Sequence, residues 1–277
     1  MAGDLPRKPS LGPQVSLQHD IFDKQNQKTF RDASVAEHYA DMTALFPPEL
    51  RALEKLRDVV RGRPIMDIGV GTGRTAPKLL ELSTDYVGID YSPEMIATCR
   101  IRFPGVRFAV GDARRLDNYD TAHFALLMFS LNGIDYVRHL DRLVILRECH
   151  RLLDDGGVFL FSNHNELWDM RAGRPLAHRT LGRVKDGVRQ LFYAGRLAPM
   201  RDGPAGHSYR CDEVFGGKQT LITYYITPEA QIEQLLSAGF VCNEIFSPNG
   251  DELRPGIRET SPSPWLYYLA RKSSRAA

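Results

Sequence analysis

The sequence predicts an α/β protein in which a mostly parallel sheet is covered by helices on both faces. Two observations support this prediction. Short apolar segments typical of buried strands alternate with longer segments whose apolar residues recur at helical spacing. The segment 122–129 is almost continuously apolar, as expected of a strand that is covered on both sides.

Composition narrows the class of protein further. The chain has 277 residues, 43% of them hydrophobic, which is enough for a sizeable core. Its net charge of +2 gives no global reason to expect nucleic acid or membrane binding. The N-terminus lacks the apolar segment of a secretory signal, and the four cysteines lack the spacing of a zinc site. We therefore expect a soluble, cytoplasmic, metal-independent protein that is a monomer or a homodimer.

The predicted elements follow one another in a regular order. Residues 1–28 mix polar residues, proline and glycine without periodicity, and we expect a flexible lead-in there. Helical spacing covers 34–60, where the Phe-Pro-Pro run at 46–48 predicts a break between two helices. The alternation then continues with strand 64–68, helix 75–82, strand 85–89, helix 92–102, strands 106–110 and 122–129, helix 140–153 and strand 158–161.

The alternation stops after the last of these strands. Residues 163–226 show no clear strand–helix pattern, and we interpret them as an inserted lid. The stretch 171–201 within the lid holds eight basic residues and one acid. The lid separates a core segment, 29–162, from the C-terminal part of the same core, 227–272.

The C-terminal part begins with a helix, 227–237. Two strands follow it, 241–246 and 265–270, and only a Pro- and Gly-rich connection joins them. Parallel neighbours need a long crossover, whereas antiparallel strands do not, so these two strands are predicted to be an antiparallel pair.

A glycine-rich turn follows the first predicted strand. It reads D-I-G-V-G-T-G-R from Asp67 to Arg74, with Gly69, Gly71 and Gly73 lying between a strand and a helix. Glycine in such a turn permits positive φ and lets a ligand approach the main chain closely. The turn therefore predicts a ligand site at the start of the helix.

Two acidic residues stand at the ends of the next strands. Asp90 ends the second strand, where a carboxylate suits hydrogen bonding to a ribose diol. Asp112, in Gly111-Asp112-Ala113, ends the third strand and can accept from an exocyclic amine such as that of adenine. The glycine turn and both acids fall at the carboxyl ends of parallel strands, where open α/β sheets bind their ligands.

Taken together, these motifs resemble the class I S-adenosylmethionine-dependent methyltransferases. The resemblance covers 34–162 closely and 227–272 more loosely. It is carried by the D-x-G-x-G-x-G run at 67–73, the acid in 88–92, the turn at 111–113 and the L-L-D-D-G-G run at 152–157. It implies a Rossmann-like sheet of seven strands, mostly parallel and with an antiparallel last strand.

The resemblance also implies S-adenosylmethionine as cofactor and a set of residues that bind it. The glycine turn would cradle the methionine part, the acid after the second strand would bind ribose, and the acid after the third would meet adenine. An aromatic residue on the N-terminal helix would close over the cofactor. The residues implied are Asp67, Gly69, Gly71, Gly73, Asp90, Tyr91, Asp112, Ala113 and Tyr39.

An NAD(P)-binding oxidoreductase is an alternative interpretation of the glycine turn. The run Gly71-x-Gly73-x-x-Ala76 matches the looser dinucleotide-binding pattern. This match requires Gly69 to lie inside the strand, and the register that starts at Gly69 places Arg74 where a small residue is needed. A dinucleotide site also does not call for an acid such as Asp112, so the methyltransferase interpretation is favoured.

Candidate catalytic and substrate residues come from the segments after the fourth and fifth strands and from the lid. Asn132 is a candidate for orienting the acceptor, and His164 for accepting the proton of a hydroxyl or phenol, because imidazole titrates near neutral pH. Local roles in their loops are the alternative for both. The lid residues that are candidates for lining a substrate pocket are Tyr193, His207, Tyr209 and Tyr225.

The predicted function is in-line methyl transfer to a small-molecule acceptor. The basic lid would suit an acceptor that carries a carboxylate or phosphate. An RNA or DNA methyltransferase that uses 171–201 on the phosphate backbone is the alternative, although Ser-Leu-Asn-Gly at 130–133 replaces the N-P-P-Y type of motif. A non-enzymatic binding module that keeps the cofactor fold is a third possibility. The acceptor atom, whether O, N, C or S, stays open.

Overall fold

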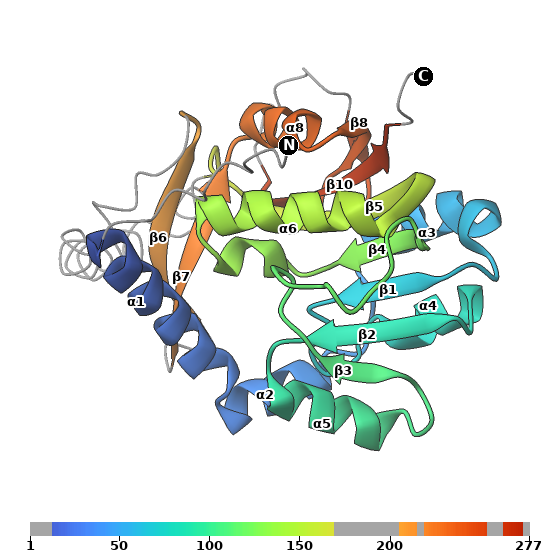
Figure 1. The fold of residues 1–277 in the computed structure, drawn as a ribbon, viewed down its shortest axis with the longest axis horizontal. Coiled ribbons are helices and arrows are strands. Elements are labelled where there is room, and N and C mark those ends of the chain that lie inside the picture. The colour runs from blue at the N-terminus through green and yellow to red at the C-terminus, as the bar shows by residue number, and fades with distance from the viewer. Residues whose placement is uncertain (1–12, 169–204, 215–218, 254–262, 274–277) are drawn as a thin grey trace, which may run out of the picture.

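The central sheet of the computed structural model is mixed and mostly parallel, as the sequence predicts (Figure 1). The structure describes residues 13–168, 205–214, 219–253 and 263–273. The strands are β1 (Ile65–Ile68), β2 (Tyr86–Asp90), β3 (Phe108–Val110), β4 (Phe124–Phe129), β5 (Leu153–Asn165), β6 (His207–Val214), β7 (Gln219–Ile226), β8 (Phe240–Phe246), β9 (Glu252–Leu253) and β10 (Trp265–Lys272). The helices are α1 (Pro13–Phe30), α2 (Ala33–Asp41), α3 (Pro47–Val60), α4 (Ala76–Leu82), α5 (Pro93–Arg102), the short 3₁₀ helix η1 (Gly133–Tyr136), α6 (His139–Leu152) and α8 (Pro228–Ser237).

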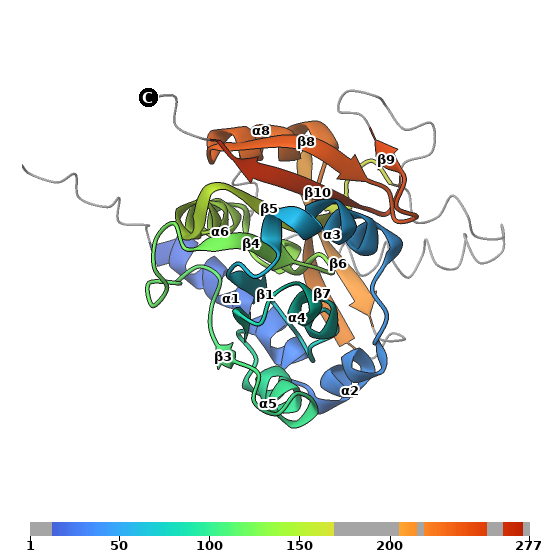
Figure 2. The same ribbon diagram turned by 90° about the vertical axis from the view of Figure 1, so that its right-hand side faces the viewer.

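The sheet separates two hydrophobic cores. In β4, Leu126 and Met128 pack with α3, α4 and α5, whereas Leu127 and Phe129 pack on the other face with α6 and α8. Successive side chains of a strand point to opposite faces, so a strand covered on both sides must be apolar at every position. Figure 2 shows α6 on one side of the sheet and α3 and α4 on the other.

The strand order β3-β2-β1-β4-β5-β10-β8-β9 confirms the closing antiparallel pair. The C-terminal strand β10 lies between β5 and β8 and is antiparallel to both, with Tyr267 opposite Ser162 on one side and Phe246 on the other. The predicted number of seven strands needs correction, because the described residues already form a sheet of ten. The three additional strands are the short β9 and a hairpin formed by β6 and β7.

The hairpin comes from the segment that we interpret as a lid. Strand β7 runs parallel to the carboxyl end of β5, with Tyr225 opposite His164 and Ile226 opposite Asn165. The hairpin therefore extends the sheet at the edge to which the parallel strands point. The basic stretch 171–201, with Tyr193, lies outside the described residues.

The run 154–157 does not simply end a helix, as the sequence led us to expect. Helix α6 ends at Leu152, and β5 begins at the next residue. The pairing of β5 with β4 jumps from Phe124–Leu153 to Leu126–Val158, so 154–157 bulges out of the ladder. Gly156 has φ of 77°, a conformation that favours glycine and permits this bulge.

The prediction of a flexible lead-in at residues 1–28 is wrong for 13–28, which form most of α1. The helix packs on β7, and Figure 1 shows it crossing beside the hairpin. Its buried residues Phe22, Asn26, Thr29 and Phe30 recur at helical spacing, but two of them are polar. A periodicity analysis of apolar residues therefore missed the helix.

Asn26 fixes α1 to the hairpin. Its side-chain amide donates to the carbonyl oxygens of Ile222 (2.8 Å) and Tyr136 (3.1 Å), and its oxygen accepts from the Ile222 amide (2.9 Å). The side chain satisfies backbone groups on both β7 and η1.

Among the described residues, no helix combines the length and apolarity that a membrane crossing requires.

We expect Asn26→Ala to lower the free energy of unfolding by about 1–3 kcal/mol, because it leaves buried backbone groups of Ile222 and Tyr136 without their partner. Equilibrium urea unfolding measures this change. Lys28→Ala, on the exposed side of the same helix, is the matched control and is expected to change stability by less than about 0.5 kcal/mol. Equal stabilities of Asn26→Ala and wild type would contradict the described attachment of α1.

Candidate active site

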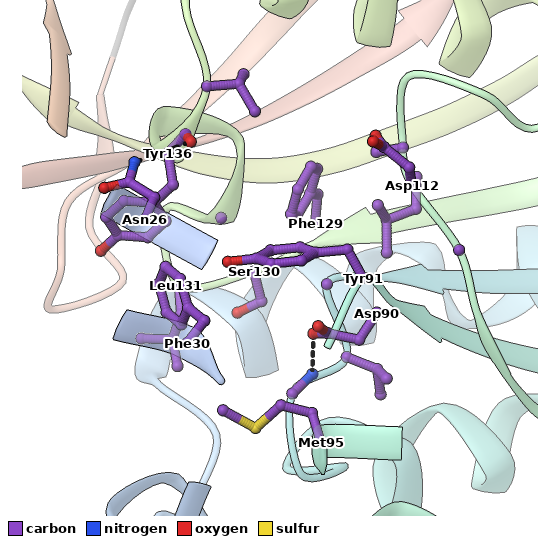
Figure 3. A pocket seen from close by; sticks show the side chains of 18 of the residues that line it. Asn26, Phe30, Asp90, Tyr91, Met95, Asp112, Phe129, Ser130, Leu131 and Tyr136 are labelled. Atoms are coloured by element: carbon purple, nitrogen blue, oxygen red, sulfur yellow. Dashed lines mark hydrogen bonds between the residues drawn. The ribbon is translucent and has the colours of Figure 1, made fainter. Parts of the chain in front are cut away.

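A cavity lies where β1, β2, β3 and β4 end and where α1 covers the sheet edge (Figure 3). Its floor is the glycine turn, its walls follow the strand ends, and its cover comes from α1 and α2. The lining residues that matter below are Asp23, Phe30, Tyr39, Gly69, Gly71, Arg74, Asp90, Tyr91, Asp112, Ala113, Arg114, Phe129, Ser130, Leu131 and Tyr136. Seven of the nine predicted cofactor residues thus line one cavity, whereas Asp67 and Gly73 do not.

The three glycines of the turn all have positive φ, and each is needed for a different reason. A Cβ on Gly69 would stand 2.6 Å from the Phe129 ring, and one on Gly73 would stand 2.5 Å from the Phe103 ring. A Cβ on Gly71 would meet nothing within 4 Å. Gly69 and Gly73 thus allow close packing, and Gly71 offers bare main chain to the cavity.

Asp67 supports the turn from beneath. Its carboxylate accepts hydrogen bonds from the hydroxyls of Thr75 and Tyr86, the latter at 3.1 Å. Burial raises the pKa of Asp67 to about 7, although both hydrogen bonds favour the charged form. These contacts tie β1 to the start of α4 and to β2, so Asp67 acts on the shape of the turn.

Asp90 joins the end of β2 to the glycine turn. One carboxylate oxygen accepts from the Gly71 amide and the other from the Ser92 amide, both at 2.9 Å. Burial raises the pKa of Asp90 to about 6, against these hydrogen bonds. Each carboxylate oxygen has a further lone pair, so Asp90 can still accept hydrogen bonds from a diol in the cavity.

Asp112 lies at the opposite end of the cavity and is held by Arg114. Burial opposes its charge, but hydrogen bonds from the Arg114 guanidinium outweigh burial and lower the pKa of Asp112. Arg114 also pairs with Asp23 of α1 (2.7 Å) and Asp141 of α6 (3.2 Å). One arginine therefore anchors the cover helix beside the carboxylate that we predict to meet adenine.

A buried ion pair closes the end of the cavity beside the glycine turn. Arg74 makes two hydrogen bonds of 2.6 Å to the Glu49 carboxylate and donates to the Ser130 hydroxyl, also at 2.6 Å. Only 5% of the Arg74 side chain and none of the Glu49 side chain is exposed. The pair links α3 to the ends of β1 and β4, so the turn is held rigidly from both sides.

An aromatic wall covers the middle of the cavity. The Phe30 ring of α1 lies 6.4 Å from Tyr39, 6.0 Å from Tyr91 and 5.0 Å from Tyr136, measured between ring centroids. Burial, followed by the charge of Asp90, raises the pKa of Tyr39 to about 12. The sequence analysis identified Tyr39 and Tyr91. It missed Phe30 and Tyr136, because neither belongs to a recognisable sequence motif.

The polar groups of the cavity suit a nucleoside-like ligand. The Tyr91 hydroxyl is buried in it, and its oxygen has no hydrogen-bond partner among the described residues. Figure 3 shows the Tyr91 ring reaching from the Asp90 side toward Leu131 and Phe30. A buried hydroxyl without a partner costs free energy, so this group is available to a ligand. The bare main chain at Gly71 and the Asp90 carboxylate are two further features that such a ligand needs.

The structure also brings together the two predicted catalytic residues. Asn132 Nδ2 lies 3.4 Å from His164 Nε2. Asp135, which the sequence analysis missed, lies 2.8 Å from His164 Nδ1 through its Oδ2 atom. The backbone of Asn132 is left-handed, with φ of 57°, at the tight turn from β4 into η1. Neither Asn132 nor His164 lines the cavity itself, but Tyr136 does, and its ring centroid lies 6.3 Å from that of His164.

The candidate substrate residues of the hairpin divide into two groups. The Tyr225 ring lies 5.0 Å from the His164 ring. His207 and Tyr209 instead pack around Tyr224, at 5.1 and 5.4 Å between centroids, away from the cavity lining. Of these side chains, Tyr225 is thus the one beside the predicted catalytic pair.

Comparisons with known proteins agree on one family. Residues 65–157 match the family model described as "Methyltransferase domain". A probable S-adenosylmethionine-dependent methyltransferase of Mycolicibacterium smegmatis is 29% identical over 115 residues, which is 41% of this chain and 43% of that protein. The demethylmenaquinone methyltransferase of Thermotoga maritima is 25% identical over 65% of this chain and 71% of its own length.

Solved structures share the fold over a larger part of the chain. The CcbJ methyltransferase from Streptomyces caelestis superposes with a TM-score of 0.56 at 16% identity, covering 90% of this chain and 100% of that one. At this identity, the likeness concerns the fold alone. The matched region also spans less than half the length of the Mycolicibacterium smegmatis relative.

We expect Asp90→Asn to weaken the binding of S-adenosylhomocysteine about 10-fold or more, because hydrogen bonds to a charged acceptor contribute about 1.5–3 kcal/mol. Isothermal titration calorimetry measures the affinity, and circular dichroism checks the fold. Asp58→Asn, at an exposed position of α3, is the control. Unchanged affinity in a folded Asp90→Asn variant would remove Asp90 from the site.

The affinity for S-adenosylhomocysteine should also depend on pH. Hydrogen-bond donors of the ligand favour the ionised carboxylate, and the pKa of Asp90 is raised to about 6. Affinity should therefore be full above pH 7 and fall as the pH drops through 6, approaching about tenfold per pH unit. The Asp90→Asn variant should lack this dependence, and an identical slope in both proteins would argue against the assignment.

Proposed function

We propose that this chain, which contains a class I S-adenosylmethionine-dependent methyltransferase domain, transfers the methyl group of its cofactor to a small-molecule acceptor. The cavity at the carboxyl ends of β1 to β4 is the observation that carries the proposal, because it combines bare main chain at Gly71 with the Asp90 carboxylate. A small acceptor is supported by the relative named demethylmenaquinone methyltransferase.

The residues of the cavity divide the work of holding the cofactor. Gly69 and Gly71 would hold the methionine part, Asp90 the ribose, and Asp112 the adenine. Once bound, S-adenosylmethionine supplies an activated methyl group on a sulfonium centre. The protein then has to bring the acceptor in line with that group and to exclude water. The aromatic wall around Phe30 is suited to excluding water.

The acceptor would approach from the side of the cavity that is lined by Leu131 and Tyr136. In this arrangement, Asn132 orients the acceptor and His164 accepts its proton. An acceptor with a carboxylate or phosphate is a finer proposal, and its support is the basic composition of 171–201.

Calorimetric titration tests the cofactor assignment. S-adenosylhomocysteine should bind the purified chain with an affinity on the order of micromolar, whereas NADH should show no heat of binding under the same conditions. Binding of NADH alone would mean that the glycine turn serves a dinucleotide. Transfer of a labelled methyl group from S-adenosylmethionine to small molecules in a cell extract would then establish turnover.

A further inference from the structure

His164 is held by the buried carboxylate of Asp135. Oδ2 of Asp135 accepts from the backbone amide of His164 at 2.6 Å and lies 2.8 Å from Nδ1 of the ring. Oδ1 pairs with the guanidinium of Arg142. Asp135 and Arg142 are fully buried. The carboxylate is therefore committed to the histidine on one side and to the arginine on the other.

Arg142 is in turn fixed from several elements. It donates to the Ile134 carbonyl at 3.0 Å and to the side-chain oxygen of Gln231, and its guanidinium lies 4.7 Å above the Tyr224 ring. Gln231 also accepts from Asn163 of β5 at 2.7 Å. Burying an ion pair costs solvation energy, and a hydrophobic pair often stabilises a fold as well.

This arrangement fixes the tautomer of the imidazole. Asp135 is an acceptor, so Nδ1 of His164 must carry the hydrogen, and Nε2 is then an acceptor with Asn132 Nδ2 at 3.4 Å. The side chain of His164 is 18% exposed, whereas that of Asp135 is fully buried. A histidine with its Nδ1–H on a buried carboxylate, whose Nε2 can exchange the 3.4 Å contact from Asn132 for an acceptor hydroxyl, is arranged as a general base.

We propose that the acceptor is a planar compound with a ring hydroxyl, a phenol or an enol, that His164 deprotonates, and that Asp135 and Arg142 are the positioning residues for this base. The inference rests on the proposed methyltransferase function. It names the class of acceptor and two residues that the sequence did not suggest.

The side chains around His164 favour an acceptor molecule with a flat ring. The imidazole has the Tyr136 ring 6.3 Å away at 71° and the Tyr225 ring 5.0 Å away at 44°. Tyr136 also lines the cofactor cavity, so an acceptor seated against it would reach from the base toward the cofactor. The oxygen of a phenol or enol gives up its proton more readily than that of an alkyl alcohol, which matches an imidazole base.

The reaction balances without a further reactant. The acceptor oxygen forms a bond to the methyl carbon while the carbon–sulfur bond breaks and the sulfur keeps the electron pair as a neutral thioether. The hydroxyl proton passes to Nε2 of His164 and from there to water. Asp135 stays ionised and stabilises the imidazolium that forms.

Other charged and titratable groups near His164 are already engaged. Asp212 of β6 accepts from the Tyr225 hydroxyl at 3.0 Å, and burial, followed by the charge of Asp212, raises the pKa of Tyr225 above its ordinary value. Arg210 lies 4.1 Å above the Tyr225 ring and pairs with Glu166 at 3.1 Å. Asp135 is thus the carboxylate in direct contact with the imidazole.

Two probes that differ only in the acceptor group test the proposal. The protein is saturated with S-adenosylhomocysteine and titrated with 1-naphthol and, separately, with 1-naphthylamine. We expect 1-naphthol to bind about fivefold more tightly or better, because its hydroxyl donates to Nε2 of His164. His164→Gln should abolish this preference, whereas His123→Gln, at an exposed position of the chain, should keep it. Equal affinities for the two probes, or no binding of 1-naphthol, would overturn the proposal.

The role of Asp135 in positioning His164 is tested by a separate measurement. Nitrogen-15 NMR of labelled wild-type protein should show His164 with its hydrogen on Nδ1. This measurement needs no variant and stands even if Asp135→Asn fails to fold. In a folded Asp135→Asn variant, the hydrogen should move to Nε2 and the preference for 1-naphthol should disappear. The Nε2–H tautomer in the wild type would contradict the role of Asp135.

Cofactor binding separates the two proposals. If the wild-type chain fails to bind S-adenosylhomocysteine, the methyltransferase function itself is wrong. If S-adenosylhomocysteine binds equally to wild type, His164→Gln and Asp135→Asn while the naphthol preference is absent throughout, only the inference about the acceptor is wrong.

Discussion

The hydrogen bond from the Gly71 amide to the Asp90 carboxylate is the contact on which the cavity depends. It joins two strand ends that the chain places 19 residues apart, and the donor residue, Gly71, takes the positive φ that favours glycine. Asp67 below the turn and the Arg74–Glu49 pair beside it fix the same loop from two further directions. The turn is therefore a rigid floor, and its carboxylate is set in place before any ligand arrives, which reduces the ordering cost of binding.

Polar contacts, rather than an apolar face alone, hold helix α1 in place over the site. Asn26 connects α1 to β7 and η1, and Arg114 connects it to Asp112 through Asp23. The cover helix thus contacts the predicted adenine end directly and meets the predicted acceptor end through Tyr136. Because η1 also carries Asp135, one short segment contributes both to the wall of the cofactor cavity and to the orientation of His164.

The sequence was sufficient for the parts of the structure that local patterns determine. Alternating strands and helices, the glycine turn and the acid at the end of β2 are contiguous signals, and the family resemblance added the Rossmann-like, mostly parallel arrangement of the sheet. Helix α1 was missed because Asn26 and Thr29 replace apolar residues on its buried face. Asp135 was missed because its contact with His164 joins residues 29 positions apart, and such a contact exists only after β4 and β5 pair. The same holds for His207 and Tyr209. We predicted from the composition of the lid that they line a pocket, but in the structure they pack around Tyr224.

A crystal structure of the protein with S-adenosylhomocysteine tests the central claim most directly. The account predicts the ribose hydroxyls on the Asp90 carboxylate, the amino-acid part over Gly69 and Gly71, and the sulfur facing the side of the cavity lined by Leu131 and Tyr136. A ligand bound elsewhere, or one whose ribose has no contact with Asp90, would contradict it.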